Sequence, residues 1–101
     1  MKIEILYLDG CPHVQPTIER LSRLLEASGL NWPIIQTKVN DQDASESVGF
    51  LGSPTVRING LDVEPAARRR RTFGMMCRTY DGGGVPSDDM IRSAITEALT
   101  E

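Results

Sequence analysis

The stretch YLDGCPHVQPTIERL, residues 7–21, joins an apolar run to a helical pattern through a turn that contains a cysteine. Residues 3–8 are mostly apolar and are followed by an aspartate and a glycine, which predicts a buried strand that ends in a turn. From Val14 onwards the apolar side chains repeat at helical spacing, and Gly29 supplies a C-terminal stop. We therefore expect Cys11 to lie between the first strand and the first helix.

Two prolines give different starts for this helix. Pro12 suits a first-turn position directly after Cys11, whereas Pro16 would remove a backbone hydrogen bond if the helix had already begun. The pattern leaves two alternatives, a kinked first turn or a regular helix that begins near Pro16.

The rest of the chain alternates between strand and helix signals. Residues 33–39 read as a second strand, and strand, helix and strand within about forty residues fit a right-handed unit with parallel strands. Asn59-Gly60 is a strong hairpin signal, and Ser87 suits the N-cap of a last amphipathic helix. The remaining predicted elements are a weak helix over 41–48, with Asp41 or Asp43 as N-cap and Gly49 as its stop, and strands over 55–58 and 61–63. The sequence thus predicts an α/β fold with the order βαβαββα.

Length and composition exclude several classes of protein. A chain of 101 residues suffices for one domain with a sizeable core, so residues 1–101 are expected to form a single domain. The formal net charge of -3 argues against a dedicated nucleic-acid binder. The N-terminal apolar stretch is short and contains Glu4, so we expect a cytoplasmic protein without a membrane span. In a reducing compartment, two cysteines are more often catalytic, redox-sensing or metal-binding than structural.

Two short motifs carry a resemblance to a known family. Cys11-Pro12-His13 lies at the junction where thioredoxins and glutaredoxins have their Cys-x-x-Cys motif, and Ser53-Pro54 lies directly before the third predicted strand. Together with the order of elements, they resemble a small bacterial thioredoxin-like (glutaredoxin-like) protein with a modified Cys-Pro-His-Val motif. Residues 61–86 depart from the pattern, because this connection is longer than in a minimal glutaredoxin.

The resemblance implies a fold and a reaction. The fold would be thioredoxin-like, with a central mixed four-stranded sheet flanked by helices and a cis peptide bond before Pro54. The reaction would be thiol-disulfide exchange with a small thiol or a protein disulfide as substrate. Pro12, Ser53, Pro54 and Thr55 would line the substrate groove, with the backbone of Ser53 free to pair with a peptide-like substrate.

Cys11 is the expected nucleophile. The N-terminus of a helix presents unpaired N–H groups and the positive end of the dipole, which favour a thiolate over a thiol, and a protonated His13 would add to this effect. The competing interpretation is a small buried apolar side chain. The motif ends in Val14, so the usual intramolecular attack by a thiol three residues away is absent.

Three explanations of Val14 remain open. In monothiol chemistry no bound cofactor is needed, and a thiol co-substrate such as glutathione releases the mixed disulfide formed on Cys11. Alternatively Cys77, 66 residues further on, folds back as the resolving thiol, against the interpretation that it packs in a core with its apolar neighbours. The third is a soft-metal site of Cys11, Cys77 and His13, which the spacing supports weakly and which we do not assign.

Two further interpretations concern the run of arginines and a function without catalysis. The run Arg68 to Arg71, with Arg78, could hold an anionic partner such as the carboxylates of glutathione, but a solvated face balanced by acidic neighbours is favoured. The alternative function from a different class is a non-catalytic thioredoxin-fold binding module for a protein, a thiol ligand or a soft metal.

Overall fold

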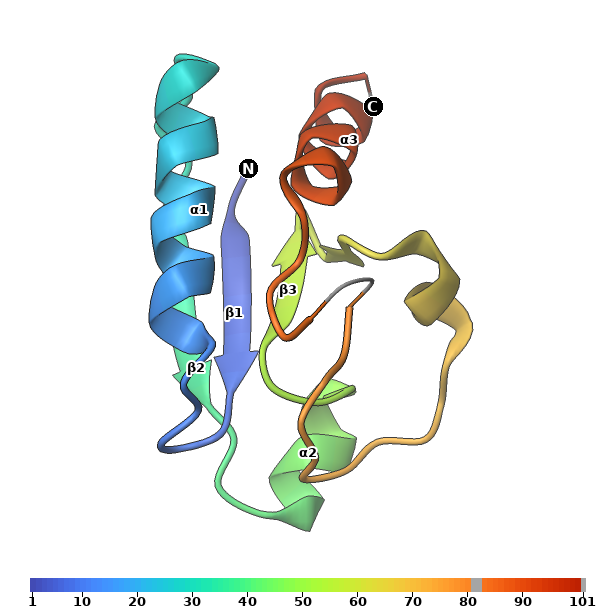
Figure 1. The fold of residues 1–101 in the computed structure, drawn as a ribbon. Coiled ribbons are helices and arrows are strands. Elements are labelled where there is room, and N and C mark those ends of the chain that lie inside the picture. The colour runs from blue at the N-terminus through green and yellow to red at the C-terminus, as the bar shows by residue number, and fades with distance from the viewer. Residues whose placement is uncertain (81–82, 101) are drawn as a thin grey trace.

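A four-stranded mixed sheet organises the computed structural model, which describes residues 1–80 and 83–100 (Figure 1). The strand order is β2-β1-β3-β4; β1 pairs parallel to β2 and antiparallel to β3, and β3 pairs antiparallel to β4. The elements are β1 (Ile3–Tyr7), α1 (Val14–Ala27), β2 (Ile34–Lys38), α2 (Gln42–Val48), β3 (Thr55–Ile58), β4 (Leu61–Asp62), η1 (Pro65–Arg69) and α3 (Asp88–Leu99). The α/β class and the mixed four-stranded sheet are confirmed.

The predicted order of elements needs a correction. A 3₁₀ helix, η1, lies between β4 and α3, so the order βαβαββα is wrong. Pro65 is the first residue of η1, where proline replaces an N–H group that would have no partner within the helix. The first helix begins at Val14 and not near Pro16. Pro16 is tolerated as its third residue, because the N–H groups of the first turn have no partner within the helix.

Local signals account for the other boundaries. The Asp41 side chain accepts the Ala44 N–H at 2.8 Å and caps α2, and Ser87 caps α3 by accepting the Met90 N–H at 3.1 Å. At the β3–β4 turn, Asn59 and Gly60 have φ values of 53° and 84°, the two positive values that a type I′ hairpin requires.

The core lies mainly between the sheet and the pair α1 and α3. Ile3 and Ile5 of β1 lie opposite Ile58 and Val56 of β3, and these four side chains pack with the apolar faces of both helices. Leu6 points to the opposite side and joins a second cluster with Val39 and Phe50. The turn after β1 and the helix α2 therefore share the end of the sheet at which β1 ends (Figure 1). In the part of the chain that the structure describes, no helix combines the length and apolarity needed to cross a membrane.

An exposed ion-pair network joins α1 to the start of α3. Arg23 donates two hydrogen bonds to the Asp88 carboxylate at 2.8 and 2.9 Å, and the Arg20 Nε lies 2.9 Å from the same group. The hydrogen bond from Arg23 lowers the pKa of Asp88 below its ordinary value. A carboxylate with a depressed pKa stabilises the fold above its unfolded-state pKa, and this stabilisation is lost as the pH falls.

Asp88→Asn is therefore expected to reduce the free energy of unfolding at pH 7, and the difference from wild type should shrink as the pH falls below about 4. Urea unfolding at several pH values between 7 and 2.5 measures this. Glu19→Gln, an exposed position on α1, is the matched control and should show a much smaller difference. A difference for Asp88→Asn that stays constant down to pH 2.5 would contradict the charge-based interpretation.

Candidate functional site

Cys11 lies in the turn between β1 and α1, two residues before His13, the N-cap of the helix. The Cys11 N–H donates to the Leu8 carbonyl at 3.2 Å, and the Cys11 carbonyl accepts from the Val14 N–H at 3.5 Å. The thiol is half-buried, and Pro12 beside it is exposed. The turn thus holds Cys11 near the first turn of α1 while leaving it partly accessible.

His13 is held from two sides. Its carbonyl accepts from the N–H of Thr17 at 3.2 Å and from the Thr17 hydroxyl at 2.7 Å. Its imidazole lies against the backbone of Gly84, because a Cβ placed on Gly84 would overlap the ring. Gly84, in the segment before α3, therefore packs onto the turn that contains Cys11.

Ser53 connects this turn to a distant part of the chain. Its hydroxyl accepts the Leu8 N–H at 3.0 Å, which ties it to the end of β1. Its backbone N–H donates to the Met76 carbonyl at 2.9 Å, and its carbonyl accepts the Arg78 N–H at 3.0 Å. The Ser53–Pro54 peptide bond is cis.

The backbone groups of Ser53 therefore bond within the chain, whereas the resemblance implied that they would be free for a substrate. Ser53 and Thr55 have no exposed surface, and Pro54 is also buried. Of the expected groove residues, Pro12 is the one that is exposed.

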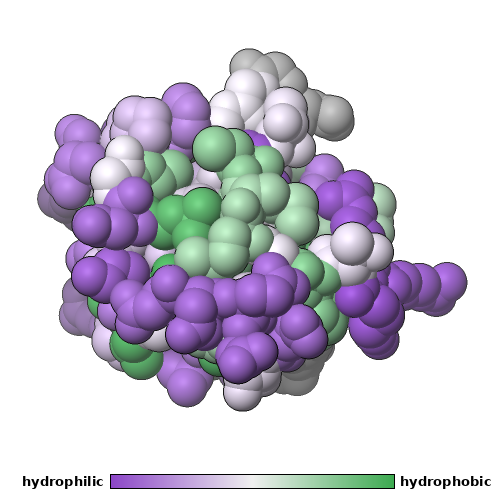
Figure 2. All heavy atoms as spheres, turned by 90° about the horizontal axis from the view of Figure 1, so that it is seen from below, coloured by the Kyte–Doolittle hydropathy of each residue, from purple (hydrophilic) through white to green (hydrophobic). Residues whose placement is uncertain are grey.

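Residues 75–78, here called the bridging segment, occupy the position beside Ser53. Cys77 is the direct partner of Ser53 in a parallel β-bridge, and its side chain is exposed. The alternative interpretation, in which Cys77 packs in a core with its apolar neighbours, is wrong, because Cys77 is exposed and Met75 and Met76 beside it are 41% and 39% exposed. Figure 2 views the end of the molecule that carries α2 and shows a hydrophobic area ringed by hydrophilic residues.

Arg78 anchors the bridging segment. Its guanidinium donates to both Asp62 oxygens at 2.7 Å and to Glu64 at 3.0 Å, and only 4% of the residue is exposed. Its head group also lies over the ring of Tyr80, 4.4 Å from the centroid, and the Tyr80 hydroxyl donates to the Pro54 carbonyl at 2.5 Å. The sequence favours a solvated face for the arginine run with Arg78, balanced by acidic neighbours. It carries no signal for the burial of Arg78.

The charge states follow from this arrangement. Burial alone would lower the pKa of Arg78, but the hydrogen bond to Asp62 and the nearby negative charges outweigh it and hold the pKa above its ordinary value. Burial raises the pKa of Tyr80. Arg78 therefore stays charged and Tyr80 stays a neutral donor at neutral pH.

The site brings together some of the predicted residues. The turn of Cys11 and the bridging segment with Cys77 both hydrogen-bond to Ser53, one through Leu8 and the other through Met76 and Arg78. Both cysteines are free thiols. Within residues 1–80 and 83–100, no group of three or more histidine, cysteine or acidic side chains is arranged to hold a metal ion.

Comparisons of the chain with protein-family models, with curated proteins and with solved structures found no match.

The Arg78–Asp62 pair makes a direct prediction. Asp62→Asn leaves a buried guanidinium without its main counter-charge, which typically costs about 3–5 kcal/mol. Urea unfolding should show this loss, and the double variant Asp62→Leu with Arg78→Met should lose less than Asp62→Asn alone, because it leaves no unpaired charge. Glu97→Gln, which removes the partner of the more exposed Arg68, is the control. A loss in Asp62→Asn no larger than in this control would disprove the assigned role of the pair.

Proposed function

We propose that this chain is a thiol-disulfide oxidoreductase-like protein in which Cys11 is the nucleophile and Cys77 the resolving thiol. The observation that carries the proposal is the hydrogen bonding of Ser53. Its hydroxyl ties it to the turn of Cys11 and its backbone pairs with the segment of Cys77. A single buried residue thus joins the two segments that carry the only two cysteines.

We further propose that the fold is thioredoxin-like. The features that support it are the parallel β1-α1-β2 unit, the antiparallel β3 and β4, and the cis bond directly before β3. The cysteine between β1 and α1 is the corresponding position for the nucleophile in that layout.

The chemistry of Cys11 follows from its place at the helix. In general, unpaired N–H groups and the dipole at a helix N-terminus favour a thiolate, which is the basis for proposing the cysteine just before α1 as the nucleophile. The imidazole of His13 lies in close contact with the backbone of Gly84. Through this contact, His13 links the turn of Cys11 to the segment before α3.

The proposed reaction consists of two thiol-disulfide exchanges. The Cys11 thiolate attacks a substrate disulfide, forms a mixed disulfide with one half and releases the other half as a thiolate. The Cys77 thiolate then attacks the Cys11 sulfur, releases the second half, and leaves a Cys11–Cys77 disulfide. The substrate gains two electrons, and two molecules of a small thiol such as glutathione return the protein to its reduced form by the reverse steps.

Val14 leaves the motif without a second thiol close to Cys11, and in the proposed route Cys77, which is paired with Ser53, supplies that thiol instead. In the chain-entropy model, a bond that closes a loop of this length stabilises the oxidised protein by up to about 4 kcal/mol. The bond requires the two Cα atoms to come within about 7 Å, which is the geometric condition for the proposal.

Mass spectrometry of the oxidised protein tests the proposal. Treatment with an excess of a small disulfide such as oxidised glutathione should give the wild type an intramolecular disulfide, seen as the loss of two hydrogens. Cys11→Ser and Cys77→Ser should each abolish it. A stable glutathione adduct on Cys11 in the wild type would contradict the resolving role of Cys77 and favour monothiol chemistry. If neither form appears, the non-catalytic binding module becomes the better explanation, because Cys11 would then show no thiol-disulfide exchange.

A second prediction concerns the position at which the family motif has its other cysteine. Val14→Cys in a Cys77→Ser background should restore the two-hydrogen loss. Val14 begins α1, and its N–H donates to the Cys11 carbonyl at 3.5 Å, which closes a turn between the two residues. Gln15→Cys in the same background is the matched control. It lies one residue further along the helix, about 100° around the axis, and should not form the bond. Equal oxidation of both variants would show that the turn does not have the proposed geometry.

A further inference from the structure

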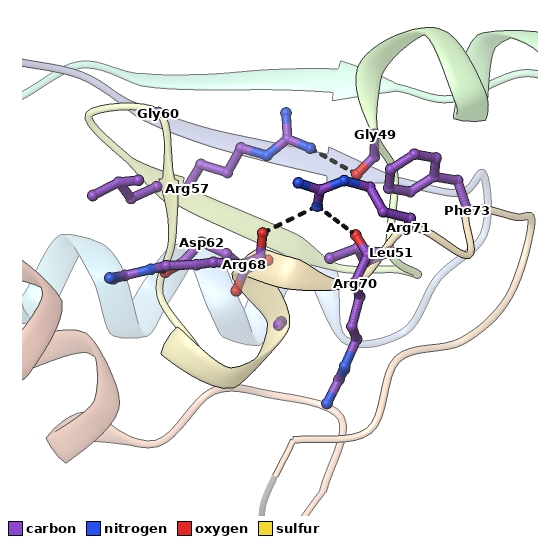
Figure 3. Close-up of a pocket in the computed structure, with 11 residues that line it drawn as sticks. Gly49, Leu51, Arg57, Gly60, Asp62, Arg68, Arg70, Arg71 and Phe73 are labelled. Carbon is purple, nitrogen blue, oxygen red and sulfur yellow. Dashed lines mark hydrogen bonds between the residues drawn. The ribbon is translucent and has the colours of Figure 1, made fainter.

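A cavity of about 220 Å³ lies on the side of the hairpin that faces η1 (Figure 3). Its walls come from the turn after α2, the β3–β4 hairpin, η1 and the segment that follows η1. Four of the eleven residues that line it are arginines. The lining residues are Gly49, Leu51, Arg57, Gly60, Leu61, Asp62, Ala67, Arg68, Arg70, Arg71 and Phe73.

Two of the four arginines have carboxylate neighbours. Arg68 donates two hydrogen bonds to Glu97 at 3.0 and 2.6 Å, and this pairing lowers the pKa of Glu97. Arg70 lies 3.7 Å from Glu64. Figure 3 shows the side chains of Arg68 and Arg70 extending away from the head groups of the other two arginines.

Arg57 and Arg71 are bonded differently. Arg57 donates to the carbonyls of Val48 and Gly49 at 2.7 and 2.8 Å, and Arg71 donates to the carbonyls of Arg68 and Arg70 at 3.3 and 3.0 Å. Within the described part of the chain, neither guanidinium pairs with a carboxylate. Asp62, the one acidic residue among the described lining residues, is already held by Arg78.

The backbone bonds orient the two guanidinium groups without neutralising them. In each case the bonds use one nitrogen, and a guanidinium has five N–H donors, so donors remain for a ligand. Two cations that line one small cavity repel each other, and a bound anion would remove this cost. Phe73 adds an apolar wall, because its ring and the Arg57 head group both lie within 3.7 Å of the position that a Cβ on Gly49 would take.

We propose that this pocket binds the phosphoryl group of a small phosphorylated molecule. A phosphate monoester has a charge between about -1.5 and -2 and three acceptor oxygens, which suits two guanidinium forks better than a single carboxylate does. The cavity is smaller than the roughly 300–1,000 Å³ typical of drug-sized ligands, so it fits a small molecule whose short organic part contacts Phe73 and Leu51. The inference stands apart from the thiol chemistry of Cys11.

Isothermal titration calorimetry of the full chain with glycerol phosphate, inorganic phosphate and acetate, at constant low ionic strength, tests the proposal. We expect saturable binding in the order glycerol phosphate, inorganic phosphate, acetate, with acetate at least tenfold weaker than inorganic phosphate. Arg57→Gln and Arg71→Gln should each weaken glycerol phosphate binding at least tenfold. Arg69→Gln is the matched control, because it removes a charge from the same run at an exposed residue outside the lining.

Four outcomes would overturn the proposal. Acetate binding as tightly as phosphate would remove the phosphoryl assignment. Inorganic phosphate binding more tightly than glycerol phosphate would show that no organic part is recognised. A loss in Arg69→Gln equal to that in Arg71→Gln, or no saturable binding of any probe, would show only diffuse attraction by surface charge. Circular dichroism melting of each variant separates a lost site from a lost fold.

Discussion

The buried ion pair between Arg78 and Asp62 is the interaction on which the arrangement around Ser53 depends. The pair fixes one end of the bridging segment against β4, and the backbone of Arg78 then reaches the Ser53 carbonyl. Gly52 permits this approach, because a Cβ there would lie 3.0 Å from the Arg78 Cβ. Desolvating two charges is costly, so such a pair stabilises only where its geometry and its additional hydrogen bonds are good. Here Glu64 supplies a further hydrogen bond, and the ring of Tyr80 covers one face of the guanidinium.

This anchoring has a consequence for the proposed chemistry. The backbone of Ser53, just before β3, has the N–H and carbonyl groups with which an extended peptide could pair. In this chain residues 76–78 already make those hydrogen bonds, so a protein substrate would have to displace them. The arrangement favours a substrate small enough to reach Cys11 without using those groups. It also places Cys77 where a substrate residue would otherwise lie, which is why an intramolecular resolving role suits it.

The features that sequence reasoning predicted are those with a local cause. Asp41 and Ser87 each cap a helix by accepting the N–H of the residue three positions later. The hairpin turn needs only the two residues that form it. The position of Cys11 between β1 and α1 follows from the same kind of signal. The environment of Cys77 and Arg78 could not be predicted in this way, because it depends on partners 24 and 16 residues away along the chain. A single arginine after Met75, Met76 and Cys77 carries no local signal that distinguishes a buried ion pair from a solvated charge.

Gly52, Asp62 and Arg78 together define a pattern by which distant relatives of this chain can be identified. The backbone at Gly52 has a φ of 109° and touches the backbone of Arg78, so a larger residue there would force the two segments apart. Arg78 in turn requires an acid at position 62. These three positions form a spacing pattern, glycine, an acid ten residues later and an arginine sixteen residues after that, which is independent of the cysteines. A search for homologues based on this pattern would not depend on the thiols, so it would test whether the scaffold occurs with and without them.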